Sequence, residues 1–89
     1  MPMFAVNRYL PDLTAAQLRV LHRALAEAAR RVSAEGQNVR YVRSMYVPAR
    51  NRCVCVFTAD TTEAVARANE IAQVPFTHID EALDPGALS

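Results

Sequence analysis

The amino-acid sequence predicts an α+β sandwich, in which two helices cover one face of a four-stranded antiparallel sheet. Two observations lead to this fold class. Two segments have the 3.6-residue apolar period of amphipathic helices, and each follows a capping sequence. Around and between them lie runs rich in valine and aromatic residues, which are typical of strands. The 89 residues suit one small domain, expected over 1–84, with a flexible tail over 85–89.

The first strand and the first helix have clear boundaries. The strand is expected over 3–10, where apolar residues occupy both alternating sets, and Pro11 ends it. Thr14 and Gln17 have the spacing of a capping box, in which each side chain bonds the backbone N–H of the other. The following helix should end at Gly36. Its apolar stripe consists of Leu18, Leu21, Leu25, Ala28 and Val32.

The second half of the chain repeats this alternation of strands and helix. The segment 39–59 is predicted to form a β-hairpin with its turn at 48–52. The second helix is expected to begin behind a cap at Asp60 and to end before Pro75. A short strand over 77–83 completes the order β-α-β-β-α-β, which is the ferredoxin-like topology.

Two helices can cover only one face of such a sheet, so the assignment of strand residues to faces determines what is exposed. We expect the covered face to carry Phe4, Val6, Val54, Val56 and Ile79. The open face then carries Ala5, Asn7, Tyr9, Cys53, Cys55, Phe57, His78 and Asp80. A face with this apolar content is unfavourable in water, and we therefore expect a homodimer that buries the open sheet face.

Charge and targeting signals argue against several classes of partner. The net charge of +1 gives no reason to expect a polyanion or a membrane surface. The sequence shows neither the pattern of a signal peptide nor a membrane-spanning apolar run, so a cytoplasmic location is expected. Several arginines lie on the hairpin, but its second strand lacks the glycine and the exposed aromatic pair that RNA-recognition strands require. We therefore expect no nucleic-acid partner.

The candidate chemical groups are few. His78 and Asp80 share one side of a strand, where the carboxylate could fix the imidazole tautomer, although a solvated edge strand explains the pair equally well. Cys53 and Cys55 could offer two thiolates to a soft or borderline metal, but packing is the favoured interpretation. Their spacing within one strand is awkward for a disulfide, so reduced thiols are expected. His22 is interpreted as a boundary residue of the first helix.

Short motifs spread along the whole chain carry a family resemblance. They are Met1-Pro2-x-Phe4, Leu13-Thr14-x-x-Gln17-Leu18, Val39-Arg40-Tyr41-Val42-Arg43-Ser44 and Cys55-Val56-Phe57-x-Ala59. In these motifs the chain resembles the family called domain of unknown function 4242, some members of which are described as nickel-binding. The resemblance implies the ferredoxin-like fold, dimers that pair their sheets, and nickel as a candidate ligand.

The chain also departs from the family pattern at positions that bear on metal binding. Asn7 stands where members often carry a carboxylate, Arg43 where a histidine is common, and Ala68 in the neighbourhood of another histidine. If those positions ligate metal, nickel should bind more weakly here than to relatives with the full set. Met45 looks like an extra residue relative to the family, as a β-bulge would introduce.

Two functions are compatible with these features. The first is a small cytoplasmic binding protein that holds nickel or a small ligand as a homodimer. Its candidate metal ligands are His78, Cys55 and Cys53, and its candidate ligand-binding residues are Asn7, Tyr9, Arg43 and Asp80. The alternative is a cofactor-free enzyme of the dimeric α+β-barrel type, a monooxygenase or cyclase, that acts on a small organic substrate.

Overall fold

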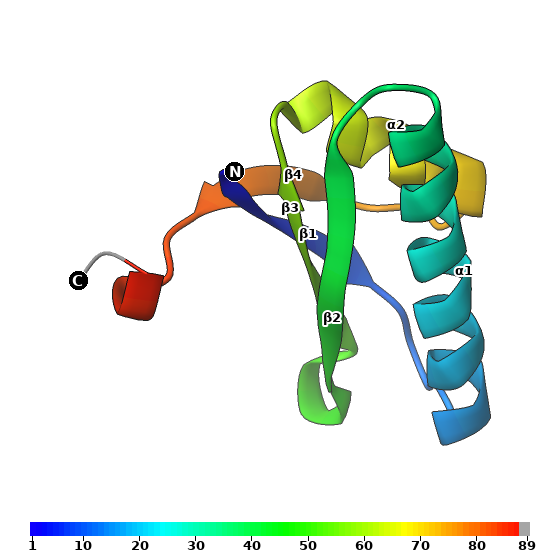
Figure 1. Ribbon diagram of the computed structural model, residues 1–89. Coiled ribbons are helices and arrows are strands. Elements are labelled where there is room, and N and C mark those ends of the chain that lie inside the picture. Colours follow the sequence, from blue (N-terminus) through cyan, green and yellow to red (C-terminus); the bar gives the residue numbers. More distant parts are fainter. Residues whose placement is uncertain (88–89) are drawn as a thin grey trace.

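The computed structural model describes residues 1–87 and confirms the predicted fold class (Figure 1). The described residues form strands β1 (Met3–Tyr9), β2 (Val39–Val47), β3 (Arg52–Ala59) and β4 (His78–Ala82), and helices α1 (Ala15–Ala34) and α2 (Thr62–Ala72). The strands make one antiparallel sheet in the order β2-β3-β1-β4, so β1 and β3 are central. Both helices lie on the same side of the sheet, which leaves the other face open (Figure 1).

Helix α1 forms as its capping sequence predicts. Thr14 Oγ1 accepts a hydrogen bond from the Gln17 backbone N–H at 3.1 Å, and Gln17 Oε1 accepts from the Thr14 N–H at 2.8 Å. The helix ends before Gly36, which adopts a φ of +101° that favours glycine. The side chains that α1 buries are Leu21, Leu25, Ala28, Ala29 and Val32.

Helix α2 begins one residue later than expected, so the prediction of Asp60 as its cap was wrong. Thr61 is the cap, and its Oγ1 accepts a hydrogen bond from the Ala64 backbone N–H at 3.2 Å. The Asp60 carboxylate instead accepts from Asn38 Nδ2 at 2.8 Å, across the two loops at this end of the sheet. Two consecutive residues with capping side chains made the position ambiguous, and this tertiary contact decides between them.

The two faces of strand β3 are exchanged relative to the prediction. It pairs with β1 so that Phe57 lies opposite Phe4 and Cys55 lies opposite Val6. Residues paired directly across two strands share a face, so Cys53, Cys55 and Phe57 lie beneath the helices with no exposed surface. Val54 and Val56 are on the open face. The assignment from sequence was wrong because a strand that is apolar on both faces fits either facing equally well.

Strand β2 contains a β-bulge, but not at Met45. Its register with β3 shifts between Tyr41 and Arg43, so the extra residue is Val42. The bulge allows Tyr41 and Ser44, which are three residues apart, both to face the helices opposite Phe57 and Cys55. Beyond it, Arg43 and Met45 are on the open face.

The C-terminal end of the chain extends away from the helices (Figure 1). A short 3₁₀ turn covers Pro85–Ala87, and the Gly86 backbone N–H donates to Asp84 Oδ1 at 2.9 Å. The flexible tail predicted over 85–89 includes residues 88 and 89, which lie outside the described residues.

Neither helix in the described part of the chain combines the length and the apolar content that crossing a membrane requires.

Candidate functional site

Four of the predicted site residues lie on the open face, on the edge strand β4 and on its neighbour β1. Asn7 and Tyr9 belong to β1, and Asn7 lies directly opposite His78 of β4. His78 Nε2 is 3.2 Å from Asp80 Oδ2, and the two side chains are 54% and 63% exposed. The structure therefore brings an imidazole, a carboxylate and an amide together at a position that solvent or a partner can reach.

Arg43 is on the same face but at the opposite edge of the sheet. The strand registers align Arg43 with Val56, Ala5 and Asp80 in one row across β2, β3, β1 and β4. Since neighbouring strands are about 4.8 Å apart, the backbones of Arg43 and Asp80 are separated by about 14 Å. The structure does not bring Arg43 into a common site with His78 and Asp80 within one chain.

A shallow cleft of about 210 Å³ lies at the end of the sheet beside His78. Asn7 and Tyr9 contribute to it from β1, and Arg50 and Arg52 border it at the hairpin turn. The lining has no carboxylate, so this cleft favours an anionic ligand over a cation. Its full lining is Asn7, Arg8, Tyr9, Arg50, Asn51, Arg52, Thr77 and His78.

The two cysteines are on the other face of the sheet from His78. Their Sγ atoms are 3.8 Å apart, and both residues are free thiols with no exposed surface. The candidate set of His78, Cys55 and Cys53 is thus divided between the open face and the core. No group of three or more histidine, cysteine or acidic residues in the described part of the chain could hold a metal ion.

The sequence interpretation missed a polar cluster beneath the helices, centred on Arg8. Arg8 is only 2% exposed, and its guanidinium donates to Asn69 Oδ1 at 2.5 Å and to the Val74 carbonyl at 3.2 Å. Asn69 is itself fully buried and donates to the Val65 carbonyl at 2.8 Å. None of the ion pairs among the described residues includes Arg8, and its Nε has no hydrogen-bond partner there. The cluster therefore contains a buried positive charge without a carboxylate to balance it.

The thiols next to Arg8 are strongly inequivalent. A hydrogen bond from the Cys53 thiol, together with the Arg8 charge and a hydrogen bond from Ser44 Oγ at 2.9 Å, lowers the pKa of Cys55 to about 6, although burial opposes the shift. The hydrogen bond to Cys55 and burial raise the pKa of Cys53. These opposite shifts favour the thiolate at Cys55, next to the Arg8 guanidinium, and the neutral thiol at Cys53.

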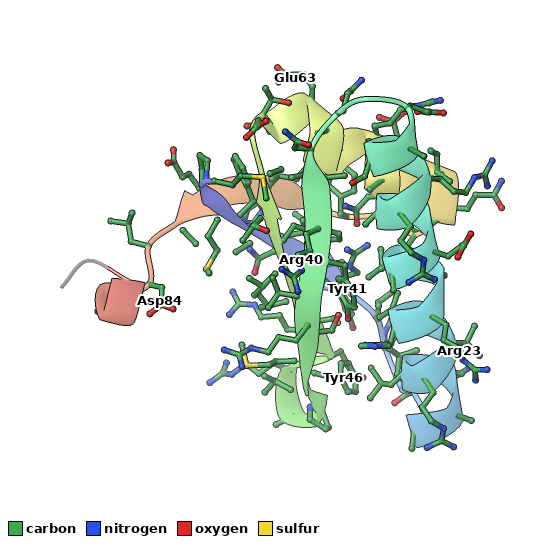
Figure 2. The ribbon with its side chains drawn as sticks, viewed as in Figure 1. Arg23, Arg40, Tyr41, Tyr46, Glu63 and Asp84 are labelled. Carbon is green, nitrogen blue, oxygen red and sulfur yellow. The ribbon has the colours of Figure 1, made fainter. Side chains whose placement is uncertain are left out.

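Residues of the edge strand β2 continue this cluster towards the surface. Tyr41 OH is 2.6 Å from Ser44 Oγ, and burial raises the pKa of Tyr41. The ring of the exposed His22 on α1 makes an edge contact with Tyr41, with 5.0 Å between the ring centroids. Figure 2 shows Tyr41 and Tyr46 extending from β2 towards α1. A hydrogen-bonded path of two side chains therefore connects the Cys55 sulfur to the edge of the sheet.

One signal in the sequence could have revealed the cluster. Arg8 is in the same alternating set as Phe4 and Val6, which were expected beneath the helices, so its burial followed from that assignment. The position of Asn69, next to Ala68 in the apolar stripe of α2, pointed to the same interior.

Comparisons with known proteins place the chain in a family. A family model described as "Nickel responsive protein SCO4226-like" matches residues 4–81. The fold is similar to the crystal structure of SCO4226 from Streptomyces coelicolor A3(2), with a TM-score of 0.78 and 23% sequence identity over 90% of this chain and 94% of that one. At this identity the structural likeness shows the fold. A search among curated proteins found no match. Because the family model covers most of the chain, the protein belongs to the family of nickel responsive, SCO4226-like proteins.

Proposed function

We propose that this protein is a small binding protein that forms a homodimer through its open sheet face and holds nickel between the two sheets. One observation carries the proposal. On the open face, each chain presents one imidazole and one carboxylate close together, beside an apolar centre of Ala5, Val54 and Val56. Two copies related by a two-fold axis supply two of each, and imidazole and carboxylate are suitable donors to a borderline divalent ion.

The proposal agrees with the family name, which describes a nickel-responsive protein. It also explains why the described part of one chain offers no complete metal site, because half of the donors belong to the second copy. His78 and Asp80 are the proposed ligands in each chain, and Asn7 lies beside them as a neutral amide. Cys53 and Cys55 have no part in this site, since they lie on the other side of the sheet.

The ligand set predicts modest affinity. An amide oxygen from Asn7 is a weaker donor to a divalent ion than a carboxylate at that position. Titration calorimetry on metal-free protein should show a nickel Kd of about micromolar, equivalent to about 8 kcal/mol, with one ion per two chains.

The variant His78→Ala should abolish this binding. The control is His22→Gln, which removes the other histidine of the sequence from the helix side of the molecule and should leave the isotherm unchanged. Nanomolar binding that survives His78→Ala would show that the nickel site lies elsewhere.

A second candidate function rests on the cleft beside His78. Its 210 Å³ is lined by Asn7, Tyr9 and two hairpin arginines, which suits a small organic anion and is compatible with a cofactor-free enzyme of the dimeric α+β-barrel type. Elemental analysis of gently purified protein distinguishes the two functions. Stoichiometric nickel supports the binding protein, whereas metal-free protein that binds small carboxylates supports the enzyme.

A further inference from the structure

We propose that Cys53 and Cys55 form a second, separate metal site, a two-sulfur site for a monovalent soft cation such as Cu(I) or Ag(I), next to the Arg8 guanidinium. The site lies beneath the helices, and the proposed nickel site lies on the open face, so neither proposal depends on the other. Thiolates select soft ions such as Cu(I), and two of them are enough for a cation of low coordination number.

The positions of the sulfur atoms suit a bridging ion. The two Sγ atoms are 3.8 Å apart. Metal–sulfur bonds of about 2.3 Å span this separation in a bent arrangement, and a linear arrangement needs about 4.6 Å. The thiols therefore need to move by less than about 1 Å to bind the ion in either geometry. A disulfide would need them to approach to about 2.05 Å from neighbouring same-face positions of a strand, which is the less favourable change.

The charge of Arg8 determines which ions fit. Sulfur binds metal as the thiolate, so two bound cysteines contribute two negative charges. The buried guanidinium contributes one positive charge, and no carboxylate of the described residues forms an ion pair with it. A monovalent cation then makes the site neutral, whereas a divalent one leaves an uncompensated positive charge in the core, which is costly. Zinc in structural sites also takes four ligands, and the described residues offer no third histidine, cysteine or acidic group here.

The route to the site runs through the edge of the sheet. Ser44 Oγ donates to Cys55 Sγ, and Tyr41 OH bonds to Ser44 Oγ. Tyr41 and Ser44 are half-buried residues of β2, and His22, at the outer end of this path, is exposed. Two side chains of an edge strand therefore separate the Cys55 sulfur from solvent.

The test is an anaerobic titration of reduced, metal-free protein with Ag(I) and with Cu(I), followed by native mass spectrometry. One ion per chain is expected, and nickel or zinc at the same concentration should not displace it. Cys53→Ala and Cys55→Ala should each lower the affinity by at least about a hundredfold. His78→Ala should leave this binding unchanged while it abolishes nickel binding, so failure of one proposal is distinguishable from failure of the other.

Two further measurements keep the proposal falsifiable if a cysteine variant does not fold. X-ray absorption on the Cu(I)-loaded wild-type protein should show two sulfur neighbours, and a coordination shell without sulfur would overturn the proposal. Arg8→Met should shift the relative affinity towards divalent ions by at least about tenfold, because it removes the balancing charge. Binding of less than one ion per chain, or binding that persists in both cysteine variants, would also overturn it.

Discussion

Arg8 lies beneath two helices, and the protein groups that hold it are mostly uncharged. Its donors reach the Asn69 amide and the carbonyls of Val74 and Pro75, so it connects β1 to the end of α2 and to the loop that follows. A buried guanidinium is costly unless its donors are satisfied and its charge is balanced. Asn69 meets the first requirement, and the lowered pKa of Cys55 favours a thiolate that meets the second.

Removal of the Asn69 amide should therefore destabilise the protein strongly. Asn69→Ala leaves the Arg8 donor without its side-chain acceptor in the core, and we expect a loss of about 3 kcal/mol in the free energy of unfolding. Urea unfolding followed by circular dichroism measures this. The matched control is Asn38→Ala, which removes an exposed bond to Asp60 and should cost less than about 1 kcal/mol. Equal losses in the two variants would contradict the role assigned to Asn69.

Cys55 should make stability depend on pH. Its pKa falls from 9.0 to about 6 on folding, so folding stabilises its thiolate. This contribution is fully present above the unfolded value and is lost as the pH falls through about 6. The pKa of Cys53 is raised, and its contribution is therefore constant below pH 9 and declines only above it. Between pH 9 and pH 6, the change from this pair comes from Cys55 alone.

The measurement is urea unfolding at pH 8 and at pH 5. The wild-type protein should exceed Cys55→Ala in stability by more at pH 8 than at pH 5, and the comparison of the two proteins cancels the contributions of the ionisable groups that they share. A difference that stays constant with pH would show that Cys55 is not a thiolate in the folded protein.

At the scale of the elements, the beginning of α2 gives a direct test of which residue is the cap. Thr61 Oγ1 accepts the Ala64 N–H, whereas the Asp60 carboxylate bonds to Asn38. Thr61→Ala should therefore cost about 1 kcal/mol of stability, and Asp60→Ala should cost less. Thermal unfolding of the two variants side by side measures the difference. A larger loss of stability in Asp60→Ala would show that Asp60 is the cap of α2, as the sequence suggested.

The sequence was sufficient for the elements whose signals are local. The capping box of Thr14 and Gln17 involves residues three apart, and it forms as predicted. The facing of β3 was not accessible in this way, because Cys53 and Cys55 alternate with Val54 and Val56 and either set can be buried. That choice depends on the pairing of β3 with β1, which joins residues about 50 positions apart.

The same distinction between local and long-range signals applies to the candidate site. His78 and Asp80 share a strand, and their proximity followed from the two-residue period. The orientation of β3 decides whether the cysteines lie on the same face as His78 and Asp80. The strand order β2-β3-β1-β4 decides how far Arg43 lies from that pair. The local sequence pattern therefore predicts pairs of neighbouring residues, and the long-range pairing of strands determines which of these residues share one site.

At the scale of the whole molecule, the corrected orientation of β3 changes the residues of the open face but keeps its centre apolar. Val54, Val56 and Ala5 occupy its centre, and Met45 and Val47 at the β2 edge are 52% and 44% exposed. A surface of this kind on a small chain is typical of a protein–protein interface. The expectation of a homodimer therefore persists as a proposal, with valines in place of cysteines and phenylalanine at the interface.

A charge at the centre of this face should separate the two copies. Val56→Glu puts a carboxylate in the row between Arg43 and Ala5, and dimerisation would have to remove both this carboxylate and the Arg43 guanidinium from water, which is costly even for a charge pair. Light scattering at micromolar concentration should show a dimer for the wild-type protein and a monomer for Val56→Glu. The control is Val20→Glu, at a 61% exposed position on α1, away from the open face, which should remain a dimer. A monomeric wild-type protein, or a dimer that persists in Val56→Glu, would show that the open face is not the interface, and nickel would then have to bind within a single chain.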